Sequence, residues 1–137
     1  MAVCPDGCDF ASDEEVIATL AGDIRRYFAG ERVDLTRHPV DLSERPRFSQ
    51  RVLAAARRIP YGRVRTYAWV ATQVGKPGAA RAVGQVMRRN PLPLLIPCHR
   101  VVGARGELTG FGGGLPLKRA LLMLEGLRCQ GDRVVLD

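Results

Sequence analysis

Long apolar stretches and a basic N-terminus are both absent from this 137-residue chain. No apolar run approaches the roughly 18 residues that cross a bilayer, and residues 1–30 lack the basic start of a secretory signal. We therefore expect a cytoplasmic protein with no membrane partner. A hydrophobic content of 46% with 26% charged residues excludes a disordered chain, and the length excludes two full-sized domains.

Cysteine and histidine are scarce, with four and two residues. Four irregularly spaced cysteines are too few for a disulfide framework in a chain of this length, so we expect reduced thiols. Cys4, Cys8 and His38 could supply three ligands to a structural zinc ion, but no second tight pair of ligands follows to complete a tetrahedral site. We therefore expect no metal and no cofactor, with this trio as the alternative.

Acidic residues are nearly absent from the second part of the chain. Residues 1–45 carry a net charge of −5, whereas residues 46–137 carry +12, with 16 basic residues against four acids. An excess of this size favours a polyanionic partner such as nucleic acid, because neutralised phosphates release their counterions. A basic surface that is merely solvated is the alternative.

Apolar residues that recur every three or four positions predict a mostly α fold with a small β component. Ser12 is the expected cap of the first helix, whose apolar positions include Val16 and Ile17. Val101-Val102 and Leu108-Thr109 are predicted to pair as a hairpin. The predicted helices are 13–29, 48–58, 67–74, 78–89 and 116–125, and residues 31–46 are predicted to form an extended segment and linker.

The helices at 67–74 and 78–89 are separated by the turn GKPG, which is the spacing of a helix-turn-helix. Small residues alternate with arginine in the second helix, so its backbone can approach another surface closely. Tight packing against the core is the alternative to a nucleic-acid groove. The candidate DNA contacts in this helix are Ala80, Arg81, Ala82, Gly84, Arg88 and Arg89.

The proline-rich segment PLPLLIP (91–97) leads directly to Cys98 and His99. Its prolines forbid a helix interior, so we expect a buried extended segment. An adjacent imidazole can take the thiol proton and lower its effective pKa, which makes Cys98 a candidate nucleophile. Among the acids of the basic region, Glu125 is the best candidate to orient the imidazole. The alternative is a buried cysteine beside a hydrogen-bonded histidine.

The stretch 48–126 resembles the C-terminal catalytic domain of the O6-alkylguanine-DNA alkyltransferases, also called methylated-DNA–protein-cysteine methyltransferases. The matching segments, in order, are IPYGRVRTY, ARAVG, NPLPLLIPCHRVVG, GFGGGL and the K…LL..E pattern at 118–125. The resemblance implies a winged helix-turn-helix-like domain over 47–137. It also implies that residues 1–46 are a shortened helical and extended remnant of the domain that precedes it in the family.

The resemblance further implies an irreversible, single-turnover transfer of the alkyl group from O6-alkylguanine to Cys98. His99 would take the thiol proton through a water molecule, oriented by Glu125. The target base must be flipped out of the duplex. Arg81 would fill the vacated stack, and Tyr67 would crowd the 3′ phosphate and donate to the leaving guanine. One copy is expected to bind each lesion, through the minor groove.

Other residues of the expected pocket follow from the same resemblance. Asn90 would tie the turn before the active-site segment, and the carbonyls of Cys98 and Val101 would read the guanine edge. Pro97 borders the expected nucleophile. The expected lid residues are Phe111, Gly112 and Gly113.

Two departures from the family pattern concern single residues. Gly112 stands where many relatives have a hydroxyl, and Leu53 replaces a tryptophan, which we expect to alter packing only. The shortened N-terminus keeps open a non-catalytic, lesion-binding sensor, although those relatives lack the residue found here as Cys98. A helix-turn-helix transcriptional regulator is the third hypothesis, but the second helix offers few base-reading side chains.

Overall fold

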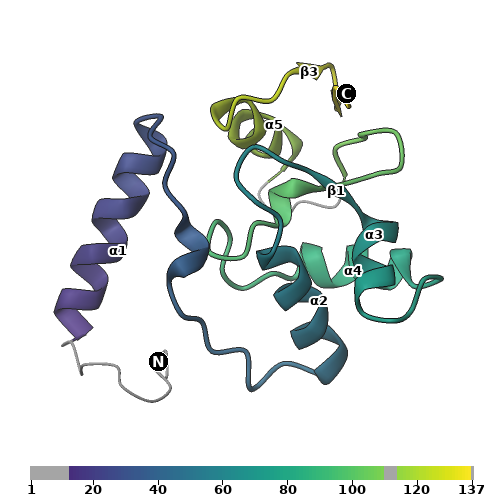
Figure 1. Ribbon diagram of the computed structural model, residues 1–137, viewed down its shortest axis with the longest axis horizontal. Coiled ribbons are helices and arrows are strands. Elements are labelled where there is room, and N and C mark those ends of the chain that lie inside the picture. Colours follow the sequence, from purple (N-terminus) through teal and green to yellow (C-terminus); the bar gives the residue numbers. More distant parts are fainter. Residues whose placement is uncertain (1–12, 110–113, 137) are drawn as a thin grey trace.

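The computed structural model describes residues 13–109 and 114–136 and confirms a mostly helical fold with a small β component (Figure 1). Its elements in order are α1 (Asp13–Phe28), η1 (Leu35–Arg37), α2 (Arg47–Arg57), β1 (Arg65–Thr66), α3 (Tyr67–Gln73), α4 (Ala80–Arg88), η2 (Cys98–Arg100), β2 (Val101–Val102), α5 (Leu115–Leu124), β3 (Cys129–Gln130) and β4 (Arg133–Val134). The two η elements are short 3₁₀ helices. No helix in the described part of the chain is long and apolar enough to cross a membrane.

Helices α2, α3 and α4 pack around one apolar core and confirm the predicted helix-turn-helix. Thr66 caps α3 as predicted, because its hydroxyl accepts a 3.0 Å hydrogen bond from the Trp69 amide. Gly75 ends this helix region with a φ of +77°. Leu53 is buried in the shared core. Helix α4 begins at Ala80, two residues later than the predicted start.

The predicted pairing of Val101-Val102 with Leu108-Thr109 is wrong. Strand β2 instead pairs in parallel with β1, which places Arg65 opposite Val101. A tight turn follows β2, and the Leu108 amide donates to the carbonyl of Asp132 at 2.8 Å. The segment around Leu108 therefore contacts the C-terminal hairpin β3–β4, whereas the sequence predicted that it would pair with β2.

Residues 91–97 form a turn and not the extended segment that their prolines predicted. Leu94 has a φ of +74°, and Pro93 bridges to Ile96. The Asn90 side chain closes this turn, donating to the Ile96 carbonyl at 2.8 Å and accepting from the Leu92 amide at 2.9 Å. Burial is confined to the end of the segment, because the turn carries only Ile96 and Pro97 into the interior.

Helix α1 lies at one side of the molecule (Figure 1). The apolar face predicted for its first turns is largely solvent-exposed, with Val16 at 43% and Ile17 at 64% exposure. The buried positions of α1 are Asp23 and Tyr27, so one end of the helix provides its anchor. The predicted cap Ser12 lies outside the described residues.

The predicted linker contains η1 and is held to α2 by Arg57, whose guanidinium donates to the carbonyls of Thr36 and His38. His38 Nε2 lies 2.7 Å from Asp23 Oδ2. The other two residues of the alternative zinc trio, Cys4 and Cys8, lie outside the described residues. The division of the chain between residues 46 and 47 remains a prediction.

Candidate active site and DNA-binding surface

Cys98 begins η2 and is only 5% exposed. Burial raises the pKa of its thiol, although the Asn90 side chain and the Lys118 cation act in the opposite direction. The predicted lowering of the Cys98 pKa is therefore wrong for the resting protein. Because a thiol is a weak nucleophile, chemistry at Cys98 requires a base that removes the proton as the sulfur attacks.

His99, the next residue in the chain, is the base that the sequence predicted. It is 1% exposed, and its Nε2 lies 2.6 Å from Glu125 Oε2. Burial lowers the pKa of His99 despite the opposing effect of Glu125, which favours the neutral imidazole. With its Nε2 proton directed at the carboxylate, the ring keeps Nδ1 as an acceptor. This buried Nδ1 has no hydrogen-bond partner among the described residues.

The 3₁₀ turn decides where these two side chains stand. The sequence predicted an extended backbone at 98–99, which would direct neighbouring side chains to opposite faces. The helical turn Cys98–Arg100 instead buries Cys98, His99 and Arg100 together. The fold thus brings the predicted nucleophile, imidazole and carboxylate into one buried cluster.

Glu125 follows the last residue of α5 and is 6% exposed. Its Oε1 accepts from Arg100 Nε at 2.9 Å and from the Gly62 amide at 3.0 Å, while Oε2 accepts from His99, from Arg100 Nη2 and from the Tyr27 hydroxyl. Burial by itself would raise the pKa of Glu125, but the hydrogen bonds from His99 and Arg100 lower it to about 2. The carboxylate is therefore ionised at neutral pH.

Lys118 is a site residue whose role the sequence reasoning missed. It is fully buried in α5, and its Nζ donates to the carbonyls of Val101 at 2.6 Å and Thr109 at 2.7 Å. Burial lowers the pKa of Lys118 to about 8, so the group is still mostly cationic at neutral pH and favours the Cys98 thiolate. The available signal was a lone lysine on the same helix face as the apolar residues Leu121 and Leu122.

Replacing Lys118 with methionine is expected to slow alkylation of Cys98 by iodoacetamide roughly tenfold at neutral pH, because loss of the cation reduces the thiolate fraction. The rate is followed by mass spectrometry of the Cys98 peptide, and its rise with pH should shift to higher pH. Lys76→Met, which changes an exposed lysine, is the matched control. Equal Cys98 rates in the two variants would show that Lys118 does not influence the thiol.

Helix α4 presents the predicted DNA contacts unequally. Arg81, Ala82 and Arg88 are exposed, whereas Ala80 is half-buried. Gly84 is also half-buried, and a Cβ at this position would lie 3.9 Å from Tyr67 Cε1. Gly84 therefore faces the Tyr67 ring. At this position the small residue serves packing within the protein, which was the alternative to DNA contact.

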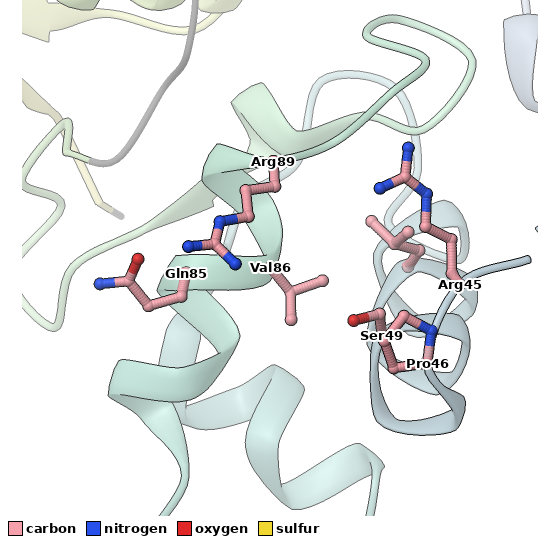
Figure 2. A pocket seen from close by; sticks show the side chains of 7 residues that line it. Arg45, Pro46, Ser49, Gln85, Val86 and Arg89 are labelled. Carbon is pink, nitrogen blue, oxygen red and sulfur yellow. The ribbon is translucent and has the colours of Figure 1, made fainter.

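Arg89 is exposed and follows the last residue of α4, where its side chain helps to line a pocket between α4 and α2. This pocket separates the two helices (Figure 2). The residues that line it are Arg45, Pro46, Ser49, Leu53, Gln85, Val86 and Arg89. Arg89 and Arg45 add positive charge to this edge of the helix-turn-helix.

Tyr67 is half-buried at the first position of α3, and its hydroxyl donates to the Thr109 carbonyl at 2.6 Å. The carbonyls of Cys98 and Val101, which the resemblance assigned to guanine recognition, accept hydrogen bonds within the protein, from the Val101 amide and from Lys118, respectively. A carbonyl oxygen has a second lone pair for a ligand. The predicted lid residues Phe111, Gly112 and Gly113 lie outside the described residues.

A protein-family model described as 6-O-methylguanine DNA methyltransferase, DNA binding domain, matches residues 47–127. The chain belongs to this methyltransferase family. A Mycobacterium bovis protein named methylated-DNA--protein-cysteine methyltransferase is 45% identical over 134 residues, which are 97% of this chain and 79% of that relative. The resemblance inferred from the sequence motifs is thus confirmed.

Solved structures of relatives contain DNA. The Mycobacterium tuberculosis OGT–DNA complex is 44% identical with a TM-score of 0.66, and the match covers 77% of this chain and 63% of that chain. Schizosaccharomyces pombe Atl1, in complex with damaged DNA containing O6-carboxymethylguanine, is 33% identical with a TM-score of 0.56, over 66% and 88% of the two chains. The fold of this methyltransferase-family chain is therefore one that binds DNA in its relatives.

Proposed function

We propose that this protein repairs DNA by transferring the alkyl group from O6 of guanine to Sγ of its own Cys98. The observation that carries the proposal is the buried Cys98–His99–Glu125 cluster within the residues matched by the methyltransferase family model. A purely structural histidine would ordinarily have both ring nitrogens satisfied. Here the Nδ1 acceptor has no partner among the described residues, which suits it to receive a proton.

The transfer is a single displacement. A bond forms between Sγ and the alkyl carbon while the bond from that carbon to guanine O6 breaks, and its electron pair remains on guanine. The thiol proton passes through a water molecule to His99 Nδ1, and the imidazolium is stabilised by ionised Glu125. The leaving guanine takes a proton from the Tyr67 hydroxyl, which solvent replaces. Because the product is a stable thioether, each copy acts once.

The helix-turn-helix is the proposed DNA-binding element. The target atom is inaccessible inside a duplex, so the nucleotide must leave the stack at a cost of a few kcal/mol. Arg81, exposed near the start of α4, is the proposed residue that fills the gap. Exposed Ala82 allows the close backbone approach that minor-groove binding needs. We place this activity in the cytoplasm and assign one copy to each lesion, because one thiol is consumed per repair.

Incubation with duplex DNA containing O6-methylguanine tests the proposal. Intact-mass analysis should show a gain of one CH₂ per protein, located by peptide mapping on Cys98, and the same duplex with unmodified guanine should cause no change. Unmodified Cys98 after long incubation with excess lesion DNA would contradict the proposed transfer.

A second candidate function, lesion sensing without transfer, is favoured by the similarity to Atl1. It predicts preferential binding of the same lesion duplex with no mass gain. The experiment above therefore distinguishes the two candidates directly.

Arg81→Ala is expected to slow alkyl transfer from duplex DNA roughly 10–100-fold, because the flipped state loses its stack filler. Reaction with free O6-benzylguanine, which requires no flipping, should change by less than about twofold. Rates are measured by the appearance of alkylated protein. Arg119→Ala removes the same charge from an exposed position on α5 and serves as the control. Equal slowing of both reactions would exclude a specific role in flipping.

A further inference from the structure

Tyr27 is a buried residue of α1 that the proposed mechanism has not used. It is 1% exposed and lies 98 residues before Glu125 in the chain. It also lies outside residues 47–127, which the family model matches. Its hydroxyl nevertheless reaches the carboxylate that orients His99.

The contact is a buried hydrogen bond to the same oxygen that faces the imidazole. Tyr27 Oη donates to Glu125 Oε2 at 2.5 Å, and His99 Nε2 lies 2.6 Å from that oxygen. Burial and the adjacent Glu125 raise the pKa of Tyr27 far above neutrality, so the hydroxyl remains a donor throughout the working pH range. Arg100 Nη2 lies 3.0 Å from the same oxygen. Three donors therefore share the charge on Glu125 Oε2.

The tyrosine ring is held firmly in this position. It packs edge-on against Tyr61, with ring centroids 6.1 Å apart, and belongs to an apolar cluster with Val33, Leu35 and Leu121. One turn earlier on the same face of α1, Asp23 pairs with the linker. The otherwise exposed helix α1 is thus attached by Asp23, which binds the linker, and by Tyr27, which binds Glu125.

We propose that Tyr27 is a positioning residue, through which the N-terminal segment orients Glu125 and limits how strongly this carboxylate acts on His99. This inference rests on the proposed function. It makes the N-terminal segment part of the site, whereas the acidic composition of that segment gave no sign of such a role. Tyr27 acts through Glu125 and has no direct contact with the reacting atoms.

The direction of the effect follows from the shared oxygen. When the tyrosine hydroxyl is removed, Oε2 loses a donor, and its charge acts more strongly on His99 and raises the pKa of the imidazole. More His99 is then protonated near neutrality and cannot accept the thiol proton. The other charged groups that face His99 are Arg100 from η2 and Lys118 from α5, and both are unchanged. The acid limb of the pH–rate profile should therefore move to higher pH.

Tyr27→Phe tests the proposal in the full-length protein. We expect the acid limb of alkyl transfer from O6-benzylguanine to move upward by about one pH unit, as for loss of a hydrogen bond to a charged group, so that the rate falls most at pH values below neutrality. An NMR titration of the His99 ring in both proteins gives a second measurement that does not depend on turnover. Far-UV circular dichroism verifies that the variant is folded.

Tyr61→Phe is the matched control, because it removes a neighbouring hydroxyl that donates to the Leu124 carbonyl at 3.4 Å and not to Glu125. Its pH–rate profile should overlay that of the wild type. An unchanged pH–rate profile and an unchanged His99 titration in Tyr27→Phe would overturn the positioning role. The proposed function would still stand in that case, provided that the wild type transfers the alkyl group. Failure of the wild type to react would instead contradict the proposed function.

Discussion

Cys98→Ala is expected to abolish alkyl transfer completely while leaving the affinity for lesion DNA within about threefold of the wild type. The sulfur supplies the bond that the transferred carbon forms in the proposed reaction. The side chain is small and buried, so its truncation should cost roughly 1 kcal/mol and preserve the fold. Intact-mass analysis after incubation with O6-methylguanine duplex measures transfer, and a gel-shift titration at fixed salt concentration measures binding.

Cys129→Ala is the control for this loss. Cys129 is a half-buried thiol in β3, outside the Cys98–His99–Glu125 cluster, and its removal should leave the mass gain unchanged. Alkylation that persisted in Cys98→Ala would assign the acceptor to another cysteine and refute the proposed mechanism. Loss of both binding and transfer would indicate that the alanine variant had not kept the native site.

Glu125→Gln is expected to have the largest effect on stability. The neutral amide can accept through one oxygen only, and its NH₂ group must face donors from Arg100 or His99. Breaking a buried charge pair in this way costs roughly 3–5 kcal/mol. The free energy of unfolding, measured in urea at pH 7, should fall by about this amount, and transfer should slow as His99 loses its orienting partner.

The pH dependence of the same variant gives a sharper test. The pKa of Glu125 in the folded protein is about 2, below the ordinary value of 4.5, so its contribution of about 3 kcal/mol is complete above pH 4.5 and is lost as the pH falls toward 2. Protonation of His99, whose pKa is lowered by burial, lowers stability below pH 6.5 in both proteins. Because Glu125→Gln has no carboxylate to protonate, the stability difference between wild type and Glu125→Gln should shrink as the pH falls from 4.5 toward 2.

Glu44→Gln makes the same chemical change at an exposed position and should stay within about 0.5 kcal/mol of the wild type at every pH. A pH-independent difference between wild type and Glu125→Gln would mean that Glu125 is not held as a buried carboxylate. The urea m-value should remain constant across the series, which verifies that the comparison concerns stability and not the unfolded state.

The successful sequence predictions rested on short-range signals. Thr66 caps α3, and α2 and α4 form where the sequence predicted helices, because caps and helix-breaking residues act over only a few residues. Elimination among the few acids of the basic region pointed to Glu125, which does contact His99. The charge excess and the Cys98-His99 pair likewise needed no tertiary information.

The errors occurred where distant segments meet. Leu94 turns because it and Leu95 pack against the cluster around Tyr27, which a local pattern of prolines does not reveal. Strand β2 pairs with β1, more than thirty residues away, in place of the adjacent segment. The thiol pKa depended on burial and on Lys118 from another helix, so a neighbouring histidine was insufficient to predict its direction.

By itself, the sequence determined the family and the helix-turn-helix and singled out Cys98 as the proposed nucleophile, because these depend on residue types at fixed spacings. Only the tertiary structure decided how the nucleophile is controlled. Burial keeps Cys98 protonated at rest, and Glu125 collects donors from three separate parts of the chain. The contribution of Tyr27 from α1 depends on a contact 98 residues long in sequence, which no local pattern encodes.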